Sequence, residues 1–166
     1  MITVYTDGAS SGNPGPGWAM YVIEESKVES QKSEVGATHE SPGISFNSPV
    51  IIKNRIRLEH CTNNDAEYLA VIHALKHLIN NHLQLIATNY NQLQPVATSF
   101  NQLQPIRFLL DSKLVVEQLN GRWKVKEPRM REYILQIHTL LKAIKKPVTF
   151  TYIPREENKA DALKYD

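Results

Sequence analysis

The fold is decided near the N-terminus, where residues 2–23 read ITVYTDGASSGNPGPGWAMYVI. Residues 2–6 alternate and are rich in β-prone side chains, which predicts a strand. Residues 8–17 contain four glycines and two prolines, a composition typical of a turn-rich loop. Residues 18–23 predict a second strand, so the chain is expected to open as two strands joined by a long loop.

An unpatterned polar stretch separates this unit from the next two elements. Residues 24–48 are polar and predict an extended loop, and residues 50–58 alternate and predict a third strand. Residues 62–79 predict a helix, because they begin with TNND, a helix-start signal in which Asn63 or Asn64 is the N-cap candidate.

A ten-residue repeat occupies residues 88–107, where TNYNQLQP is followed by TSFNQLQP. Two copies are too few for a solenoid. A duplicated surface loop is the simpler interpretation, and a partner-binding loop rich in Asn and Gln is the alternative.

The last third of the chain predicts further strand–helix units. Strands are expected at residues 106–110 and 148–153, and helices at residues 112–120, from Pro128 onward and from Asn158 onward. Three consecutive strands followed by strand–helix units predict an α/β fold, with helices on the faces of a mixed sheet.

Length and composition limit the class of protein. The chain has 166 residues, 42% hydrophobic and 22% charged, which predicts one domain over residues 1–166 and excludes a collagen or a coiled coil. Loop insertions are expected at about residues 24–48 and 81–105. The single cysteine, Cys61, can form neither an internal disulfide nor a zinc site of paired cysteines. With no signal-peptide pattern and no long apolar run, we expect a cytoplasmic monomer.

Charge is distributed unevenly along the chain. The formal net charge is +2, and residues 111–166 have 12 Lys and Arg against 8 Asp and Glu. A basic second half beside isolated acids is compatible with a polyanionic partner, although many solvated surfaces have the same composition.

Four acidic residues stand at the ends of predicted elements: Asp7, Glu67, Asp111 and Asp161. Each has a simpler explanation on its own, as a turn former or as a first-turn acid that complements a helix dipole. Four carboxylates near one edge of a sheet repel one another unless divalent cations neutralise them. Oxygen ligands alone favour Mg²⁺ or Mn²⁺ over zinc or copper.

Several motifs, taken in order, resemble type 1 ribonuclease H of the compact prokaryotic and archaeal-like subgroup. The motifs are YTDGAS at 5–10, NPG at 13–15, TNNDAE at 62–67, LDS at 110–112, IPREEN at 153–158 and ADAL at 160–163. The resemblance covers nearly the whole chain. It implies a ribonuclease H-like five-stranded mixed sheet flanked by helices. It also implies metal-dependent cleavage of the RNA strand of RNA–DNA hybrids.

The resemblance further implies roles for the four acids, which match the catalytic and metal-binding carboxylates of the family. Two Mg²⁺ ions about 4 Å apart, with Mn²⁺ as a substitute, are expected to activate a water and stabilise the leaving oxygen. Asp7 is expected to bridge the two ions, Asp111 and Glu67 to hold one of them, and Asp161 to hold the other.

The same resemblance implies a set of substrate-binding residues: Gly8, Ala9, Asn13, Asn63, Asn64, Lys113, Trp123 and Lys124. Small side chains at 8 and 9 let the backbone approach a sugar, and the 2′-hydroxyl distinguishes RNA from DNA. Trp123 and Lys124 lie where the family grips the DNA strand. The alternative for this segment is a solvated basic turn with Trp123 packed on the last helix.

Two departures from the family pattern keep other functions open. The loop at residues 154–159 has no histidine, and Arg155, Glu156 or Glu157 are the candidates to replace it. Asn158 and Asp161 are three residues apart rather than four, so without metal we expect Asp161 to be the least firmly held of the acids or to point away from them. The alternatives are a catalytically weak or silent nucleic-acid-binding module of the same fold, another phosphoryl-transfer enzyme of the superfamily, and activity on duplex RNA.

Overall fold

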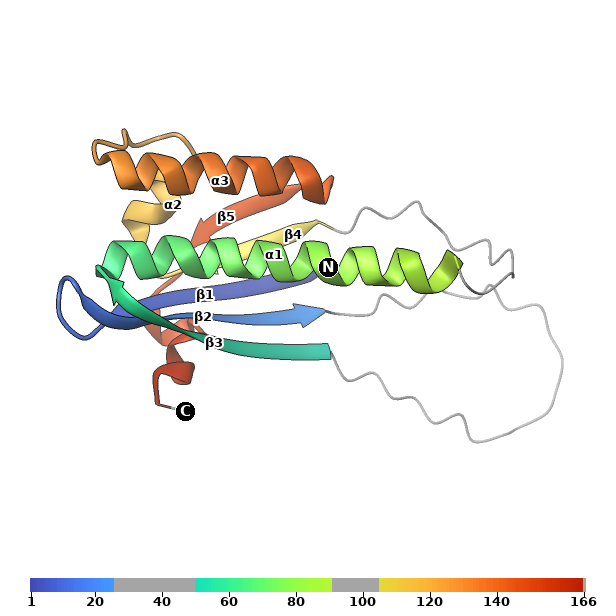
Figure 1. Ribbon diagram of the computed structural model, residues 1–166, viewed down its shortest axis with the longest axis horizontal. Coiled ribbons are helices and arrows are strands. Elements are labelled where there is room, and N and C mark those ends of the chain that lie inside the picture. The colour runs from blue at the N-terminus through green and yellow to red at the C-terminus, as the bar shows by residue number, and fades with distance from the viewer. Residues whose placement is uncertain (26–49, 91–104, 166) are drawn as a thin grey trace, which may run out of the picture.

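The computed structural model describes residues 1–25, 50–90 and 105–165, with the backbone alone for 82–90. Within these residues, five strands form one sheet in the order β3-β2-β1-β4-β5 (Figure 1). The strands are β1 (Ile2–Ser10), β2 (Gly15–Glu25), β3 (Val50–Cys61), β4 (Ile106–Leu110) and β5 (Val148–Tyr152). β1, β2 and β3 pair antiparallel, whereas β4 is parallel to both β1 and β5. The predicted five-stranded mixed sheet is confirmed.

Helices and short turns cover both faces of the sheet. The helices are α1 (Asn63–Tyr90), α2 (Lys113–Leu119) and α3 (Pro128–Ile144), and two 3-10 turns follow, η1 (Arg155–Glu157) and η2 (Asp161–Lys164). α1 and α3 lie side by side on one face, over a core that includes Phe108 and Leu75 (Figure 1). On the other face, Leu163 of η2 packs with Met20 and Val22 of β2.

The first two strands are longer than predicted, and the loop between them is shorter. β1 and β2 stay paired as far as Ser10 and Gly17, so the strands include much of the glycine-rich segment that was predicted to be a loop. Gly17 serves close packing here, because a Cβ on it would lie 2.4 Å from the carbonyl oxygen of Ala9. Composition alone does not distinguish this use of glycine from a turn.

Helix α1 is capped by Thr62, not by Asn63 or Asn64 as predicted. The Oγ1 of Thr62 accepts a hydrogen bond from the backbone N–H of Asp65 at 3.2 Å. The Oδ2 of Asp65 in return accepts one from the backbone N–H of Thr62 at 2.7 Å. This reciprocal pair is a capping box, and it leaves the Asn63 and Asn64 side chains available for other contacts.

Helix α1 also extends further than predicted, to Tyr90 rather than Ile79. Residues 63–90 contain neither glycine nor proline, so nothing in the sequence stops the helix earlier. The first part of the insertion predicted at 81–105 therefore continues α1, and residues 24 and 25 belong to β2. The remaining parts of both predicted insertions, and most of the repeat, lie outside the described residues.

The other differences concern element ends. β3 runs on to Cys61, β5 ends at Tyr152, and the helix predicted from Asn158 is replaced by the short turn η2, with η1 just before it. In a 3-10 turn, side chains three residues apart align, which lets Ala160 and Leu163 both face the apolar patch on β2. No helix in the described part of the chain is long and apolar enough to cross a bilayer.

Replacing residues 91–104 with a short Gly/Ser linker is expected to leave thermal stability, and the hybrid cleavage that the resemblance implies, nearly unchanged. The anchor points of this segment are the end of α1 and the start of β4. Tyr90 lies about 35 Å along the helix from Glu67, and closure entropy depends only weakly on loop length. Melting temperature and hybrid cleavage of the replaced protein check this expectation. If the replaced protein is insoluble or does not bind the hybrid, the segment belongs to the core or to the binding surface.

Candidate active site

Two of the predicted acids meet at the carboxyl edge of the parallel strands. Thr6 of β1 pairs with Leu110 of β4, so the residues that follow, Asp7 and Asp111, lie next to each other. Asp7 is only 1% exposed, and an aspartate is almost never buried to this extent unless it has a partner. The strand register therefore places Asp7 and Asp111 side by side at this edge of the sheet.

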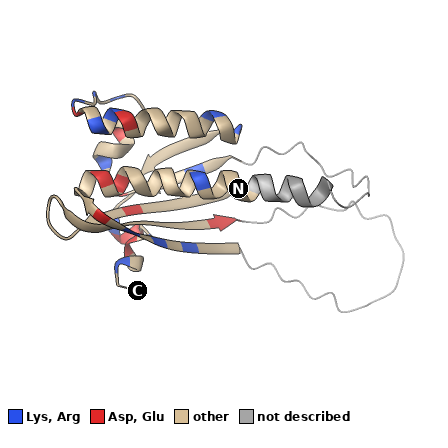
Figure 2. Ribbon diagram, viewed as in Figure 1, with Lys and Arg blue, Asp and Glu red and all other residues tan. Residues whose placement is uncertain are grey.

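The third acid, Glu67, is brought in by the first turn of α1. This turn rests on Gly8, where an added Cβ would lie 2.2 Å from the backbone nitrogen of Glu67. Asp7, Glu67 and Asp111 each place a carboxylate oxygen within 4.8 Å of the others. Figure 2 shows acidic residues on β1 and in the first turn of α1 at the same end of the molecule.

The fourth acid, Asp161, lies outside this group of three and contacts two positively charged side chains. Its Oδ1 accepts hydrogen bonds from Arg155 Nε at 2.9 Å and from Lys164 Nζ at 2.6 Å. The same Lys164 Nζ lies 2.7 Å from Oδ2 of Asp7. Asp161 is thus connected to Asp7 through the ammonium group of Lys164. Lys164 was not among the predicted site residues.

Asn158 is a second residue that sequence analysis did not place in the site. It is 4% exposed, and its Nδ2 donates to the carbonyl oxygen of Thr6 at 2.9 Å and to Oδ1 of Asp111 at 3.1 Å. Its own Oδ1 accepts from the backbone N–H of Ala160 at 3.1 Å. Asn158 therefore fixes the orientation of Asp111. The signal that could have identified it is its position in the IPREEN motif.

Burial and mutual repulsion raise the pKa values of the central carboxyls. The pKa of Asp7 is raised to about 6, chiefly by burial, with repulsion from Asp111 and Asp161 adding to the rise and Lys164 opposing it. Burial also raises the pKa of Glu67 well above its usual value, with added repulsion from Asp7 and Asp111. The pKa of Asp161 is lowered, because its hydrogen bonds to Lys164 and Arg155 outweigh the effect of burial.

The raised pKa of Asp7 predicts that the metal-free protein loses stability as pH rises. Between about pH 4 and pH 6 the folded Asp7 keeps a proton that the unfolded chain releases, so folding becomes less favourable across this window. The free energy of unfolding of the wild type, relative to Asp7→Asn, should fall by up to about 3 kcal/mol from pH 4 to pH 7. Urea unfolding in a chelator at several pH values measures this difference. A constant difference would contradict the buried environment of Asp7.

The donor set fits a divalent cation. The buried Oε2 of Glu67 has no hydrogen-bond partner, although it faces two other carboxylates. A buried oxygen without a donor is costly, and a bound cation satisfies it. Clustered carboxylate oxygens are the ligands preferred by hard ions such as Mg²⁺. Asp7, Glu67 and Asp111 could therefore hold a metal ion.

The comparisons with known proteins identify the family. The family model described as RNase H matches residues 1–160. The chain belongs to the RNase H family. The predicted resemblance and the class of enzyme are thereby confirmed at the level of the family.

Three relatives of this RNase H chain illustrate the similarity. Ribonuclease HI of Halobacterium salinarum is 28% identical over 98% of this chain and 61% of its own length. The bifunctional protein Rv2228c of Mycobacterium tuberculosis is 28% identical over 99% of this chain and 35% of its own length. The chain thus spans only part of these curated relatives. LC11-RNase H1, solved in complex with an RNA/DNA hybrid, matches with a TM-score of 0.65 and 27% identity, over 98% of this chain and 93% of that one.

Four of the predicted substrate-binding residues of this RNase H domain lie together beside the carboxylates. Gly8 and Ala9 continue β1 from Asp7, and the turn at residues 11–14 follows. The backbone N–H and hydroxyl of Ser10 both donate to Oδ1 of Asn63 at 2.9 Å. The backbone N–H of Asn63 donates to Oδ1 of Asn13 at 3.3 Å. These bonds tie the turn to the start of α1. The Asn63 side chain can accept the bonds from Ser10 because Thr62, and not Asn63, caps the helix.

The remaining predicted substrate-binding residues are exposed on separate elements. Asn64 is on the first turn of α1, Lys113 begins α2, and Trp123 and Lys124 are in the segment between α2 and α3. Trp123 is 47% exposed, which favours an accessible surface over the alternative of full packing on the last helix. Gln118 braces this segment by donating to the carbonyl oxygen of Lys124 at 3.2 Å.

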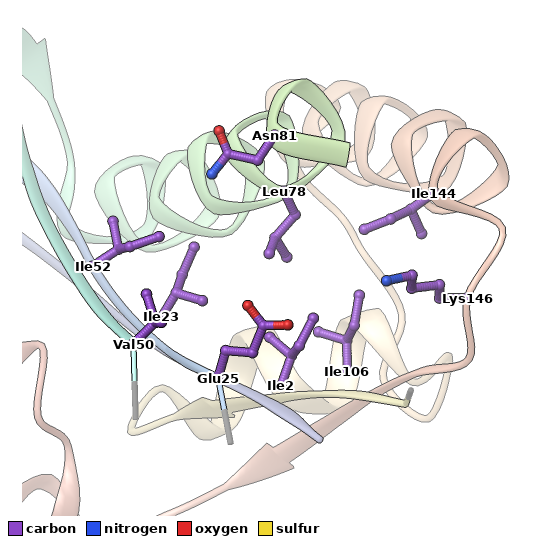
Figure 3. Close-up of a pocket in the computed structure, with 10 residues that line it drawn as sticks. All are labelled: Ile2, Ile23, Glu25, Val50, Ile52, Leu78, Asn81, Ile106, Ile144 and Lys146. Atoms are coloured by element: carbon purple, nitrogen blue, oxygen red, sulfur yellow. The ribbon is translucent and has the colours of Figure 1, made fainter. Parts of the chain in front are cut away.

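Two hollows in the surface differ in their relation to the carboxylates. A pocket of about 90 Å³ at the other end of the sheet is lined by aliphatic side chains, among them Ile2, Ile106 and Ile144, and contains none of the predicted site residues (Figure 3). A larger, open hollow of about 440 Å³ is lined by Ala9, Trp18, Lys164 and their neighbours. The second hollow adjoins the site through Lys164, which also contacts Asp7.

Proposed function

We propose that this chain is a metal-dependent endonuclease that hydrolyses the RNA strand of RNA–DNA hybrids. The observation that carries the proposal is the convergence of Asp7, Glu67 and Asp111 within 4.8 Å, in a chain of the RNase H family. Further support comes from LC11-RNase H1, a structural neighbour that was solved with an RNA/DNA hybrid.

We also propose a two-metal mechanism with Mg²⁺, for which Mn²⁺ can substitute. When bound, the ions supply an activated water and stabilise the leaving oxygen. Asp7 would be shared between the two ions, Glu67 and Asp111 would help to hold the first, and Asp161 would help to hold the second. Asn158 keeps Oδ1 of Asp111 in a fixed orientation through the bond at 3.1 Å.

The protein's own groups select and orient the nucleic acid in this proposal. Gly8, Ala9 and the tied side chains of Asn13 and Asn63 present main-chain and amide groups at the rim of the carboxylate site, where a ribose 2′-hydroxyl can be recognised. Asn64 and Lys113 extend this rim. The exposed Trp123 and Lys124 supply an aromatic face and a positive charge for the DNA strand.

A catalytically weak or silent nucleic-acid-binding module is the second candidate. The observation that favours it is the ammonium group of Lys164, which lies 2.7 Å from Asp7 and neutralises part of the charge that would attract a metal ion. Such a module would bind a hybrid without cutting it.

One assay separates the candidates. Labelled RNA–DNA hybrid, duplex RNA and duplex DNA of the same sequence are incubated with Mg²⁺ or with a chelator, using wild type and Asp7→Asn. We expect metal-dependent cleavage of the hybrid by the wild type alone, and duplex DNA should stay intact. Hybrid binding without cleavage would support the silent module. Cleavage of duplex DNA would point to another enzyme of the superfamily, and cleavage of duplex RNA would extend the substrate range.

We further propose a monomer in the cytoplasm. Support for the location comes from Cys61, a buried free thiol of the kind that persists in reducing compartments. Size-exclusion chromatography with light scattering tests the monomer, and localisation of a tagged chain tests the compartment.

A further inference from the structure

The side chain of Lys164 is held at the edge of the carboxylate site by the turn that carries it. The preceding residue, Leu163, is 4% exposed and packs with Met20 and Val22 on the outer face of the sheet. This anchor directs Lys164 toward Asp7, and the Lys164 side chain is only 14% exposed. Lys164 is therefore a well-packed residue of the site and not a solvated surface lysine.

The ammonium group of Lys164 bridges two carboxylates. Its Nζ lies 2.7 Å from Oδ2 of Asp7 and 2.6 Å from Oδ1 of Asp161. These are the two acids that the proposed function assigns to the second metal ion. A cation that bridges the same two oxygens would overlap with Nζ, so the ammonium and a divalent ion exclude each other there.

The first metal position is different, because no lysine or arginine in the described part of the chain bridges its acids. Glu67 keeps a buried oxygen without a partner, and its nearest acidic neighbours are Asp7 and Asp111. Asp111 is bonded to the neutral amide of Asn158. We therefore expect that an ion can bind among these three acids while Lys164 stays at Oδ2 of Asp7.

We propose that Lys164 is an internal counter-cation that occupies the place of the second metal ion and makes metal binding stepwise. This inference rests on the proposed function. The first ion binds with Lys164 in position, whereas the second binds only when the flexible lysine side chain withdraws. Arg155 keeps its contact with Asp161 in either state, because its bond at 2.9 Å does not involve Asp7.

Competition of this kind lowers the affinity for the second ion without affecting the first. The affinity for the second ion is reduced by the small fraction of molecules in which Lys164 has withdrawn and left the position open. Removing the lysine charge should therefore tighten the second binding event about tenfold or more, and the protein should then reach full metal occupancy at lower Mg²⁺.

Calorimetric titration with Mg²⁺, in the absence of nucleic acid, tests this inference on four proteins. Lys164→Met removes the charge and keeps most of the stem, and Lys164→Arg retains the charge. Lys159→Met is the matched control, because Lys159 pairs with Glu24 at 2.6 Å on the same terminal segment and contacts none of the four acids in the described structure. The second Mg²⁺ ion should bind weakly to the wild type, Lys164→Arg and Lys159→Met. It should bind more tightly to Lys164→Met.

Melting temperatures with and without Mg²⁺ give a second readout that needs no catalysis. Without metal, Lys164→Met should melt below the wild type because Asp7 and Asp161 lose their shared counter-charge, and saturating Mg²⁺ should raise its melting temperature by more than that of the wild type. Lys164→Gln provides the same comparison if the methionine variant folds poorly. The inference would be overturned if all proteins had the same affinity for the second ion and the same metal-induced rise in melting temperature. Binding of the first ion in that case would still support the proposed metal site. If no protein binds metal at all, the proposed function fails together with the inference.

Discussion

Asp111→Asn is expected to reduce cleavage of an RNA–DNA hybrid by about 10³-fold or more, because metal stabilisation of developing charge is worth several kcal/mol. An amide in place of this carboxylate is a weaker, uncharged ligand. Asparagine keeps the oxygen that accepts from Asn158 at 3.1 Å, so the local geometry should survive. Hybrid binding should persist, since the rim residues around Asn63 are unchanged.

The same substitution should not lower the stability of the metal-free protein. The charge of Asp111 contributes to the raised pKa of both Asp7 and Glu67, so removing it relieves repulsion. Single-turnover cleavage, hybrid binding and melting temperature are the three measurements. Glu132→Gln, the same change of charge on the exposed side of α3, should match the wild type in all three. Near-normal turnover of Asp111→Asn at saturating Mg²⁺ would remove Asp111 from the site.

Gly8→Ala is expected to destabilise the protein by about 3 kcal/mol or more, because the added carbon meets backbone and not a movable side chain. The Cβ would lie 2.2 Å from the nitrogen of Glu67 and 2.3 Å from the carbonyl carbon of Ala66. The first turn of α1 must move away from β1 to make room. Such a shift carries Glu67 away from Asp7, so metal affinity should fall together with stability.

Gly121→Ala is the comparison for this prediction. Gly121 has a φ of +72° and nothing within 4 Å of an added Cβ, so the cost should be the left-handed conformation alone, about 1 kcal/mol. Urea unfolding of the two variants in a chelator gives the difference. Equal costs would show that β1 and α1 do not touch closely at Gly8.

The sheet and the three acids that cluster at its edge could be predicted because each is marked by local sequence. Asp7 and Asp111 each follow a short β-prone run, and Glu67 follows a recognisable helix start. The order of the family motifs along the chain then matched these acids to the carboxylates of the family. The extent of elements was harder to predict, because glycine is equally compatible with a turn and with the close packing found at Gly17. Only the tertiary pairing of β1 with β2, which sets Gly17 opposite Ser10, decides between them.

The residues that complete the site could not be found by local pattern. Asn158 acts by bonding to Thr6 and Asp111, which are distant in the sequence, so its role depends on tertiary contacts. Lys164 looks like one more surface lysine in the sequence. Its importance arises because Leu163 anchors the turn against β2 and thereby aims the ammonium group at Asp7. The choice of Thr62 over its neighbours as the helix cap likewise depends on the return bond from Asp65.

The proposed cutting of the RNA strand by the carboxylate site with bound metal can be measured on one hybrid whose RNA and DNA strands have different fluorescent labels. The hybrid is incubated with the wild type over a range of Mg²⁺ concentrations and with a chelator. We expect that only the RNA strand is shortened, and only when metal is present. Shortening of the DNA strand to the same extent, or cutting of the RNA strand in the chelator, would contradict it.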